Sequence, residues 1–256
     1  MKVISFILFI GLFYSCVEHT AQIKEEMMFV KQIEVNIKYA KGFTVDVSNK
    51  NFTKIIISTH NSVYNFTDSI FIAHSPNFKP NGRKVFKGNY NTLALQSSTY
   101  LAYLDVIGKL NLVKGISGLQ YVNSENYSQN FSKNKTKEIS IDGNIQMETL
   151  LSINPDLFLI YPFELDNVED YEKKGVQTLL IAEYLENTAL GRLEWIKLFG
   201  LIFGEYEKAE AYFAKTEKNY FVQTQEVDPE NTLFFNLPFK DNWSMPSSNS
   251  TTVNLT

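Results

Sequence analysis

Several polar and aromatic side chains directly follow short apolar runs, which is where α/β proteins carry their ligand-binding loops. They combine hydroxyl groups, one carboxylate and aromatic rings, a set able to hold a flat or catecholate-like ligand. Because aromatic residues make up 14% of the chain, packing between loops is an alternative role for each ring. The candidate ligand-binding residues in these loops are Ser97, Ser98, Tyr100, Tyr121, Tyr161, Phe163, Glu183 and Tyr184.

The elements that position these loops alternate between predicted strands and helices. Alternation of this kind indicates a parallel sheet of the Rossmann type, whose strands end at one common edge. Hydroxyl groups between Gln96 and Thr99 are expected to cap the first helix. The predicted strands cover residues 93–95, 112–116, 157–160 and 177–181, and the predicted helices cover 101–107, 147–152 and 168–173.

Two helices are predicted in the segment that follows this α/β region. Asn187 and Thr188 offer a cap, and apolar residues then recur at helical spacing as far as Phe203. Gly204 interrupts the pattern, and a second amphipathic helix is expected from residue 205 to about 225. A helix of that length spans about 30 Å and leads to a short strand predicted at residues 233–235. It is therefore expected to bridge two lobes.

The first 26 residues are predicted to be an export signal followed by a tether. Lys2 precedes an apolar run from Val3 to Tyr14, which has the length of a signal-peptide core and is short for a membrane span. Cys16, the one cysteine of the chain, follows at once, and this placement predicts lipid attachment at Cys16. The mature protein is then expected in the cell envelope of a bacterium, in the periplasm and anchored to the membrane by lipid. A plain secretory signal is the alternative.

A strand-rich extension is expected between the tether and the α/β region, because Phe43, Val45 and Val47 alternate with polar residues. His60 and His74 lie in this extension. Three histidines in the whole chain, without a cysteine partner nearby, match no metal-site spacing. No metal site is predicted.

The composition indicates a globular protein with a large core. Hydrophobic residues make up 44% of 256 residues, including 20 Phe and 14 Tyr. A net charge of -4 argues against nucleic-acid binding, which uses a basic surface.

An enzyme is a rival class, because Glu183 lies close to Glu186 and a second acidic group comprises Asp166, Glu169 and Asp170. Their spacing is unspecific, and no nucleophile elbow, phosphate loop, dinucleotide fingerprint or HExxH motif occurs. A solvated acidic face is therefore expected, and no enzymatic activity. A surface lipoprotein that binds a glycan or a protein partner stays open as an alternative.

The order and spacing of several sequence blocks resemble the ABC-transporter substrate-binding proteins of the iron-siderophore, haem and cobalamin class. The resemblance covers roughly residues 35 to 256. The blocks are YAKGF at 39–43, LALQSSTYLAYLDVIGKLNLVKGISG at 93–118, METLLSINPDLFLIYP at 147–162, EYLE at 183–186, LGRLEWIKLFG at 190–200 and LPFKDNWSMPSSNS at 237–250.

The resemblance implies two α/β lobes joined by one long helix, with an iron-siderophore, haem or corrinoid as the ligand and no resident cofactor. It places Phe239 and Trp243 on the facing wall of the ligand cleft. It also implies that Glu148 docks on the membrane permease, whose own partner is an ATPase, whereas an unpartnered surface glutamate is the alternative. Because residues 227–256 are too few for a lobe, the second lobe is expected to be incomplete.

The expected organisation is therefore a β-rich extension, a Rossmann-like α/β lobe, a bridging helix and a partial second lobe. In residue numbers it comprises a signal peptide at 1–15, a lipid-anchored tether at 16–26, the extension at 27–90, the N-terminal lobe at 91–204, the bridging helix at 205–226 and the partial C-terminal lobe at 227–256.

Overall fold

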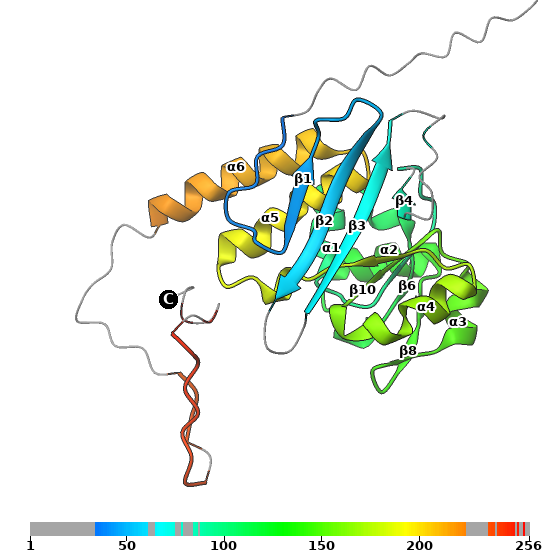
Figure 1. Ribbon diagram of the computed structural model, residues 1–256. Helices are drawn as coiled ribbons and strands as arrows, with labels where there is room; N and C mark the ends of the chain where they lie inside the picture. Colours follow the sequence, from blue (N-terminus) through cyan, green and yellow to red (C-terminus); the bar gives the residue numbers. More distant parts are fainter. Residues whose placement is uncertain are drawn as a thin grey trace, which may run out of the picture. The chain divides into compact units, whose positions relative to one another are not determined.

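A computed structural model describes residues 34–60, 65–74, 78, 84–86, 88–223, 235–238, 240–248, 250 and 253 (Figure 1). The predicted signal peptide, tether and Cys16 lie outside these residues, as does Phe239. Of the strand predicted at 233–235, only Phe235 is described, and it is not in a strand.

The first sheet has the strand order β1-β2-β3-β4 and corresponds to the predicted strand-rich region. β1 (Phe43–Asp46), β2 (Phe52–His60) and β3 (Asn65–Ala73) pair antiparallel, and β4 (Lys84–Phe86) is parallel to β3. Ile55 and Ile57 of β2 are fully buried whereas Ile56 between them is only partly covered. This period of two means that the sheet buries one face.

The second sheet has the strand order β11-β10-β5-β6-β7, and all its pairs are parallel. The predicted parallel α/β sheet is thus confirmed. Its central strands are buried on both faces, which is why each reads as an unbroken apolar run. The strands are β5 (Leu93–Leu95), β6 (Val113–Ile116), β7 (Lys137–Glu138), β10 (Leu157–Ile160) and β11 (Thr178–Leu180).

Six α-helices lie in the described part of the chain, together with four short 3₁₀ turns. Thr188 caps α5 as predicted, since its hydroxyl accepts the Gly191 N–H at 3.0 Å. The helices are α1 (Tyr100–Val106), α2 (Glu125–Asn134), α3 (Met147–Ile153), α4 (Leu165–Lys173), α5 (Ala189–Ile202) and α6 (Tyr206–Gln223). The turns are η1 (Leu110–Leu112), η2 (Leu119–Tyr121), η3 (Pro162–Glu164) and η4 (Glu183–Leu185).

The region between residues 119 and 146 contains elements that the apolar pattern did not predict. They are α2, the edge strand β7 and a two-stranded hairpin of β8 (Ser140–Ile141) and β9 (Asn144–Ile145). Among the α2 side chains whose burial is described, Phe131 is the buried one, and the three strands have two residues each. Elements this short and polar leave no periodic signal.

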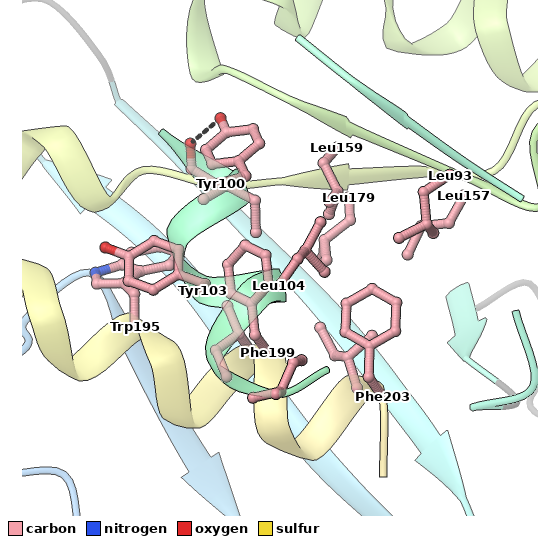
Figure 2. Close-up of a cluster of buried hydrophobic side chains, with 14 of the residues drawn as sticks. Leu93, Tyr100, Tyr103, Leu104, Leu157, Leu159, Leu179, Trp195, Phe199 and Phe203 are labelled. Carbon is pink, nitrogen blue, oxygen red and sulfur yellow. Dashed lines mark hydrogen bonds between the residues drawn. The ribbon is translucent and has the colours of Figure 1, made fainter. Parts of the chain in front are cut away.

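Two hydrophobic clusters cover the two faces of the parallel sheet. The smaller cluster joins Phe158 and Ile160 of the sheet to Leu150 of α3 and Tyr171 of α4. The larger cluster lies on the other face, where α1 and α5 pack (Figure 2). It continues without a break into the first sheet through Phe43, Ile57 and Phe86. The sequence boundary expected at residue 90 therefore does not divide the core.

α6 packs along α5 in its first half (Figure 1). Gly200 permits the close approach, because a Cβ at this position would lie 2.6 Å from the Cβ of Ala209. Phe213 is buried on the same side, whereas Phe221 and Val222 at the far end of α6 are exposed. The helix predicted as a bridge is thus confirmed as a helix, and its connection to a second lobe stays a prediction.

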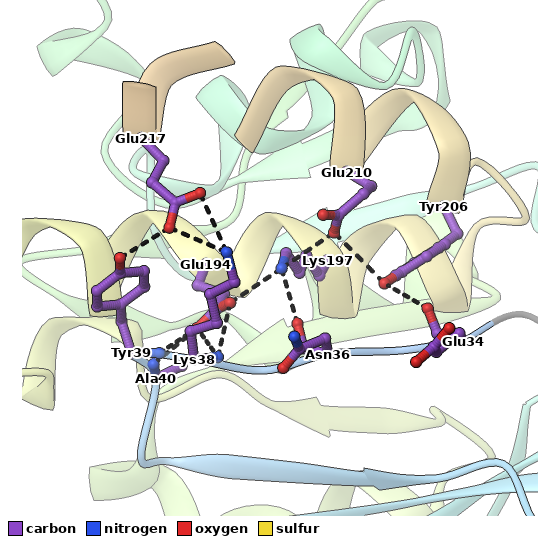
Figure 3. Close-up of polar contacts among 10 residues, drawn as sticks. All are labelled: Glu34, Asn36, Lys38, Tyr39, Ala40, Glu194, Lys197, Tyr206, Glu210 and Glu217. Atoms are coloured by element: carbon purple, nitrogen blue, oxygen red, sulfur yellow. Dashed lines mark hydrogen bonds and ion pairs between the residues drawn. The ribbon is translucent and has the colours of Figure 1, made fainter. Parts of the chain in front are cut away.

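Residues 38–42, which we call the strap, run over α5 and are held by two buried glutamates, of which Figure 3 shows Glu194. The Glu194 carboxylate accepts the backbone N–H groups of Lys38, Tyr39 and Ala40 at 2.7–3.0 Å. The Lys197 amine pairs with Glu194 at 3.0 Å, and the side chains of both residues have no exposed surface.

The second glutamate is Glu186, whose carboxylate accepts the N–H groups of Lys41 and Gly42 and the indole N–H of Trp195. Glu186 is 6% exposed. The solvated acidic face expected for this residue is therefore wrong. The two glutamates fasten the start of the first sheet to α5.

Candidate ligand-binding site

The predicted loops after β5, β10 and β11 meet at the carboxyl edge of the parallel sheet, because these strands are neighbours in the sheet order. The Gln96 side chain ties two of the loops together, since its Oε1 accepts the Tyr161 N–H at 2.7 Å. Topology thus brings Ser97, Tyr161 and Glu183 to one place, as expected from alternating strands and helices.

Tyr161 is the centre of an aromatic group at this edge. Its ring centroid lies 5.0 Å from that of Phe163 and 5.3 Å from that of Tyr184. Phe163 is 53% exposed and Tyr161 is half-buried. The rings of Phe163 and Tyr161 therefore reach solvent as an apolar surface, whereas the Tyr184 hydroxyl oxygen is buried.

Tyr100 lies behind this surface, with its ring 5.7 Å from Tyr161 and 6.1 Å from Phe199. It has no exposed surface, and its hydroxyl donates to the Ile181 carbonyl at 3.5 Å (Figure 2). Burial raises the pKa of Tyr100 well above its ordinary value. As the first residue of α1 it packs into the core, so it supports the aromatic group from behind.

Two hydroxyl groups beside the aromatic group lead to the Glu183 carboxylate. Thr99 Oγ1 donates to Glu183 Oε1 at 2.8 Å, and Ser97 Oγ lies 2.8 Å from Thr99 Oγ1. Burial raises the pKa of the nearby Tyr161 hydroxyl, and the hydroxyl groups of Ser97 and Thr99 act on this pKa in the opposite direction. We call Ser97, Thr99, Tyr161 and Glu183 the hydroxyl cluster.

Thr99 was expected to cap α1 together with Ser97 and Ser98. Instead α1 has no side-chain cap. The Thr99 hydroxyl turns to Glu183, and the Thr99 N–H donates to Ser97 Oγ at 3.1 Å. Sequence reasoning missed Thr99 as a site residue because a hydroxyl before a helix reads first as a cap.

Glu183 is buried, with 2% of its surface exposed. Burial raises the pKa of its carboxyl group, and the hydrogen bond from Thr99 and the charge of Arg192 act in the opposite direction. Oε2 has no hydrogen bond of good geometry within the described residues, although the main-chain N–H groups of Glu183 and Tyr184 lie near enough to favour the charged form. The solvated position expected for this acidic residue is wrong.

Tyr121 is on η2, the turn that follows β6, and is 74% exposed. Gly118 before it has a φ of 79°, and the Glu138 carboxylate accepts the N–H groups of Gly118 and Leu119 at 3.1 and 2.7 Å. Tyr121 packs against Gly118 and contacts none of the other described aromatic rings. Its ligand contact stays a prediction.

The remaining predicted residues have these positions. Ser98 lies in the same loop, half-buried, and its carbonyl accepts the Leu101 N–H. Trp243 is 48% exposed, and its indole N–H donates to the Phe235 carbonyl at 2.9 Å within its own segment. Glu148 is exposed in the first turn of α3. The roles given to these three residues stay predictions.

Among the hollows in the described residues are one of about 320 Å³ and one of about 220 Å³, and neither is lined by the hydroxyl cluster. The larger lies between the strap and the start of α5, and the smaller lies beside α3 and α4. The aromatic group lines neither hollow; we call it the aromatic wall, and its contact with a ligand stays a prediction.

Within the described ranges no three His, Cys, Asp or Glu side chains come together as a metal site. His74 Nε2 lies 2.8 Å from Thr53 Oγ1, and burial lowers the pKa of its imidazole. The same part of the chain holds no helix with the length and apolar character needed to cross a bilayer.

Comparison with known sequences gives one family and several partial relatives. The model of a family described as periplasmic binding protein matches residues 97–250, more than half of the chain. An uncharacterized lipoprotein of Methanocaldococcus jannaschii is 27% identical over 144 residues, covering 53% of this chain and 35% of the relative. An uncharacterized protein of the same organism is 29% identical over 119 residues, covering 44% and 36%. The chain thus spans about a third of the length of these relatives.

Solved structures are similar over about half of their length. A periplasmic binding protein from Veillonella parvula has a TM-score of 0.49 and 14% identity, covering 68% of this chain and 55% of that chain. A periplasmic heme binding protein from Pseudomonas aeruginosa has a TM-score of 0.44 and 14% identity, covering 53% and 46%. An ABC-type Fe³⁺-hydroxamate transport system protein from Saccharomonospora viridis has a TM-score of 0.43 and 20% identity, covering 54% and 51%.

Proposed function

Because the chain belongs to the periplasmic binding protein family, we propose that it captures an iron chelate for an ABC importer and delivers the chelate to the membrane permease. The chelate would be a ferric siderophore, a haem or a corrinoid such as cobalamin. Members of this family bind solutes, and the chain is a binding protein, not an enzyme.

The observation that carries this proposal is the aromatic wall at the carboxyl edge of the parallel sheet. Phe163 and Tyr161 offer ring faces, and Ser97 and Thr99 offer hydroxyl groups beside them. A catecholate ring or a macrocycle has a flat apolar face with polar groups at its rim, so it fits a surface of this composition.

Delivery would use groups outside the wall. Glu148, exposed on α3, would pair with a basic group of the permease, and the permease would work with its ATPase. Cys16 would carry the lipid that holds the protein at the membrane of the cell envelope. One of the relatives in Methanocaldococcus jannaschii bears the name lipoprotein, which supports this anchoring. Trp243 would contact the chelate from the opposite side.

A binding titration tests the proposal directly. Ferric siderophores of the catecholate and hydroxamate types, haem and cobalamin would be titrated into the full chain, with isothermal calorimetry and tryptophan emission as readouts. Tyr161→Ala should weaken binding of the preferred chelate at least about tenfold, as expected for a central aromatic contact.

Tyr212→Ala is the matched control, because Tyr212 is a 42% exposed tyrosine on α6. The control should bind as the unaltered chain does. If no chelate binds while a glycan does, the protein belongs to the alternative class of surface lectins. If both variants lost the same amount of chelate affinity, the aromatic wall would not be part of the binding site.

A further inference from the structure

The turn that follows β6 is fastened by the carboxylate of Glu138. Gly118 lies at the start of η2 with a φ of 79°, and its N–H donates to Glu138 Oε1 at 3.1 Å. The Leu119 N–H donates to the other oxygen, Oε2, at 2.7 Å. The first N–H groups of a helical turn have no acceptor within the turn, so Glu138 supplies the acceptors that the turn itself lacks.

The Glu138 carboxylate is itself held in place from two directions. Glu138 ends β7 and pairs with Ile116 of β6 in the parallel register. Its Oε1 accepts the N–H and the hydroxyl group of Ser140 at 2.9 and 2.7 Å, and the Ser117 hydroxyl donates to Ser140 Oγ at 2.7 Å. The carboxylate thus joins the turn after β6 to the start of β8.

These hydrogen bonds favour the charged form of Glu138. Burial by itself would raise the pKa of its carboxyl group, but the hydrogen bonds from Ser140, Leu119 and Gly118 lower that pKa below its ordinary value. A charged acceptor makes stronger hydrogen bonds than a neutral one. The turn is therefore expected to be closed at neutral pH in the absence of a ligand.

Tyr121 is the aromatic residue of this turn, and 74% of its surface is exposed. Its N–H donates to the Gly118 carbonyl at 2.9 Å, and its ring packs so close to Gly118 that a Cβ there would lie 3.0 Å from Tyr121 Cδ2. The direction of the ring therefore follows from the conformation of the turn. Because β5 and β6 are neighbours in the sheet, the turn lies next to the loop of Ser97 at the carboxyl edge.

We propose that Glu138 is a positioning residue of the chelate site, whose carboxylate fixes the turn after β6 before a ligand arrives, so that Tyr121 is already placed to contact the chelate. This inference deepens the proposed function and rests on it for the identity of the ligand. A side chain and a turn that are ordered in advance lose less conformational entropy on binding, so preorganisation raises affinity. Loss of the fastening should therefore weaken binding about three- to tenfold.

Hydrogen exchange measured by NMR on the full chain tests the fastening without a ligand. In Glu138→Gln the side-chain amide keeps the shape of the carboxyl group, but it offers one accepting oxygen to the N–H groups of Gly118 and Leu119 instead of two. At least one of these two amides should exchange about tenfold faster than in the unaltered chain, whereas the amides of β10 should keep their rates. Unchanged protection of both amides would overturn the proposal.

Glu125→Gln is the matched control. Glu125 is exposed in the first turn of α2, the helix that follows η2, and its carboxylate accepts the Gln129 side-chain amide at 3.2 Å. This substitution removes the same charge from the chain but leaves the acceptors of the turn in place, so the exchange of Gly118 and Leu119 should not change. Equal acceleration in both variants would mean that the lost charge opens the turn, and the proposal would be wrong.

A double-mutant cycle on ligand binding tests the link between Glu138 and Tyr121. The probes are the catecholate ferric enterobactin, the hydroxamate ferrichrome, haem and cobalamin, and the cycle uses whichever of the four binds most tightly. Glu138→Gln and Tyr121→Ala should each weaken binding. A residue that acts through Tyr121 has no further effect once that ring is gone, so the double variant should bind as Tyr121→Ala does. Losses that add in the double variant would overturn the proposal, because Glu138 would then act independently of Tyr121.

The outcomes of the cycle separate this inference from the proposed function. If a chelate binds and Glu138→Gln loses no affinity, the positioning role is wrong whereas the proposed function stands. If none of the four chelates binds, the proposed function fails, and the positioning role fails with it whatever the exchange rates are.

Discussion

Replacing Glu194 with alanine should remove much of the stability of the fold. The carboxylate accepts three backbone N–H groups of the strap and pairs with Lys197, and both side chains are completely buried. Loss of one partner from a buried ion pair costs about 3–5 kcal/mol. The amine retains Glu210 at 3.0 Å and the Asn36 carbonyl at 2.8 Å, so a loss of about 3 kcal/mol is expected, at the lower end of that range.

That loss is a large part of the ~5–15 kcal/mol by which domains are stable. Urea denaturation followed by circular dichroism would measure it, with the slope of the transition checked for constancy. Glu207→Ala is the matched control, since Glu207 is exposed in the first turn of α6 and should change stability by less than about 0.5 kcal/mol.

Hydrogen exchange gives a second measurement on the same variant. The amides of Lys38, Tyr39 and Ala40 lose their acceptor in Glu194→Ala, so they should exchange much faster than the amides of β2. A loss below about 1 kcal/mol with unchanged protection of the strap would refute the assignment of Glu194 as its main fastening.

Three other substitutions follow from close contacts and burial. Gly200→Ala would place a methyl group inside contact distance of α6 and should cost about 1–3 kcal/mol, seen as a lower Tm; an unchanged Tm would show that the helices can separate freely. Gly42→Ala would put its Cβ 2.7 Å from Trp195 Cζ2, so in a Trp243→Phe background the tryptophan emission should shift to the red. Burial lowers the pKa of His74, so the unfolded chain binds its proton first, and stability should fall as the pH drops below about 6.5. In denaturant titrations, the free energy of unfolding of His74→Gln should depend less on pH than that of the unaltered chain. An identical pH dependence would contradict this role of His74.

Much of the parallel sheet could be predicted because its strands are apolar on both faces. Leu93–Leu95 and Leu157–Ile160 coincide with predicted runs, and Thr188 caps α5 as its residue type indicates. β7, β8, β9 and α2 were missed, since strands of two residues and a polar helix carry no periodic pattern.

The position of the site was predictable from topology, but its chemistry was not. Loops after parallel strands meet at one edge, so Tyr161, Glu183 and Tyr184 were expected together and are found together. Contacts between residues far apart in the sequence leave no pattern in the residues around them. The burial of Tyr100 and the turn of Thr99 toward Glu183 are two such cases.

The roles of Glu186 and Glu194 were also beyond local patterns, because their partners are backbone groups about 150 residues earlier in the chain. A glutamate beside an apolar helical pattern is normally assigned to solvent. Here the carboxylates satisfy N–H groups that no strand partner reaches.

Because the two glutamates bind backbone N–H groups, the amino-acid identities of the strap residues are only weakly constrained. Five consecutive N–H groups, from Lys38 to Gly42, donate to Glu186 or Glu194, so proline is forbidden at each of these positions whereas most other exchanges at Lys38, Ala40 and Lys41 are permitted. Diverged relatives of this chain should therefore keep the glutamate that follows η4 and the glutamate on α5 even where the strap residues have changed.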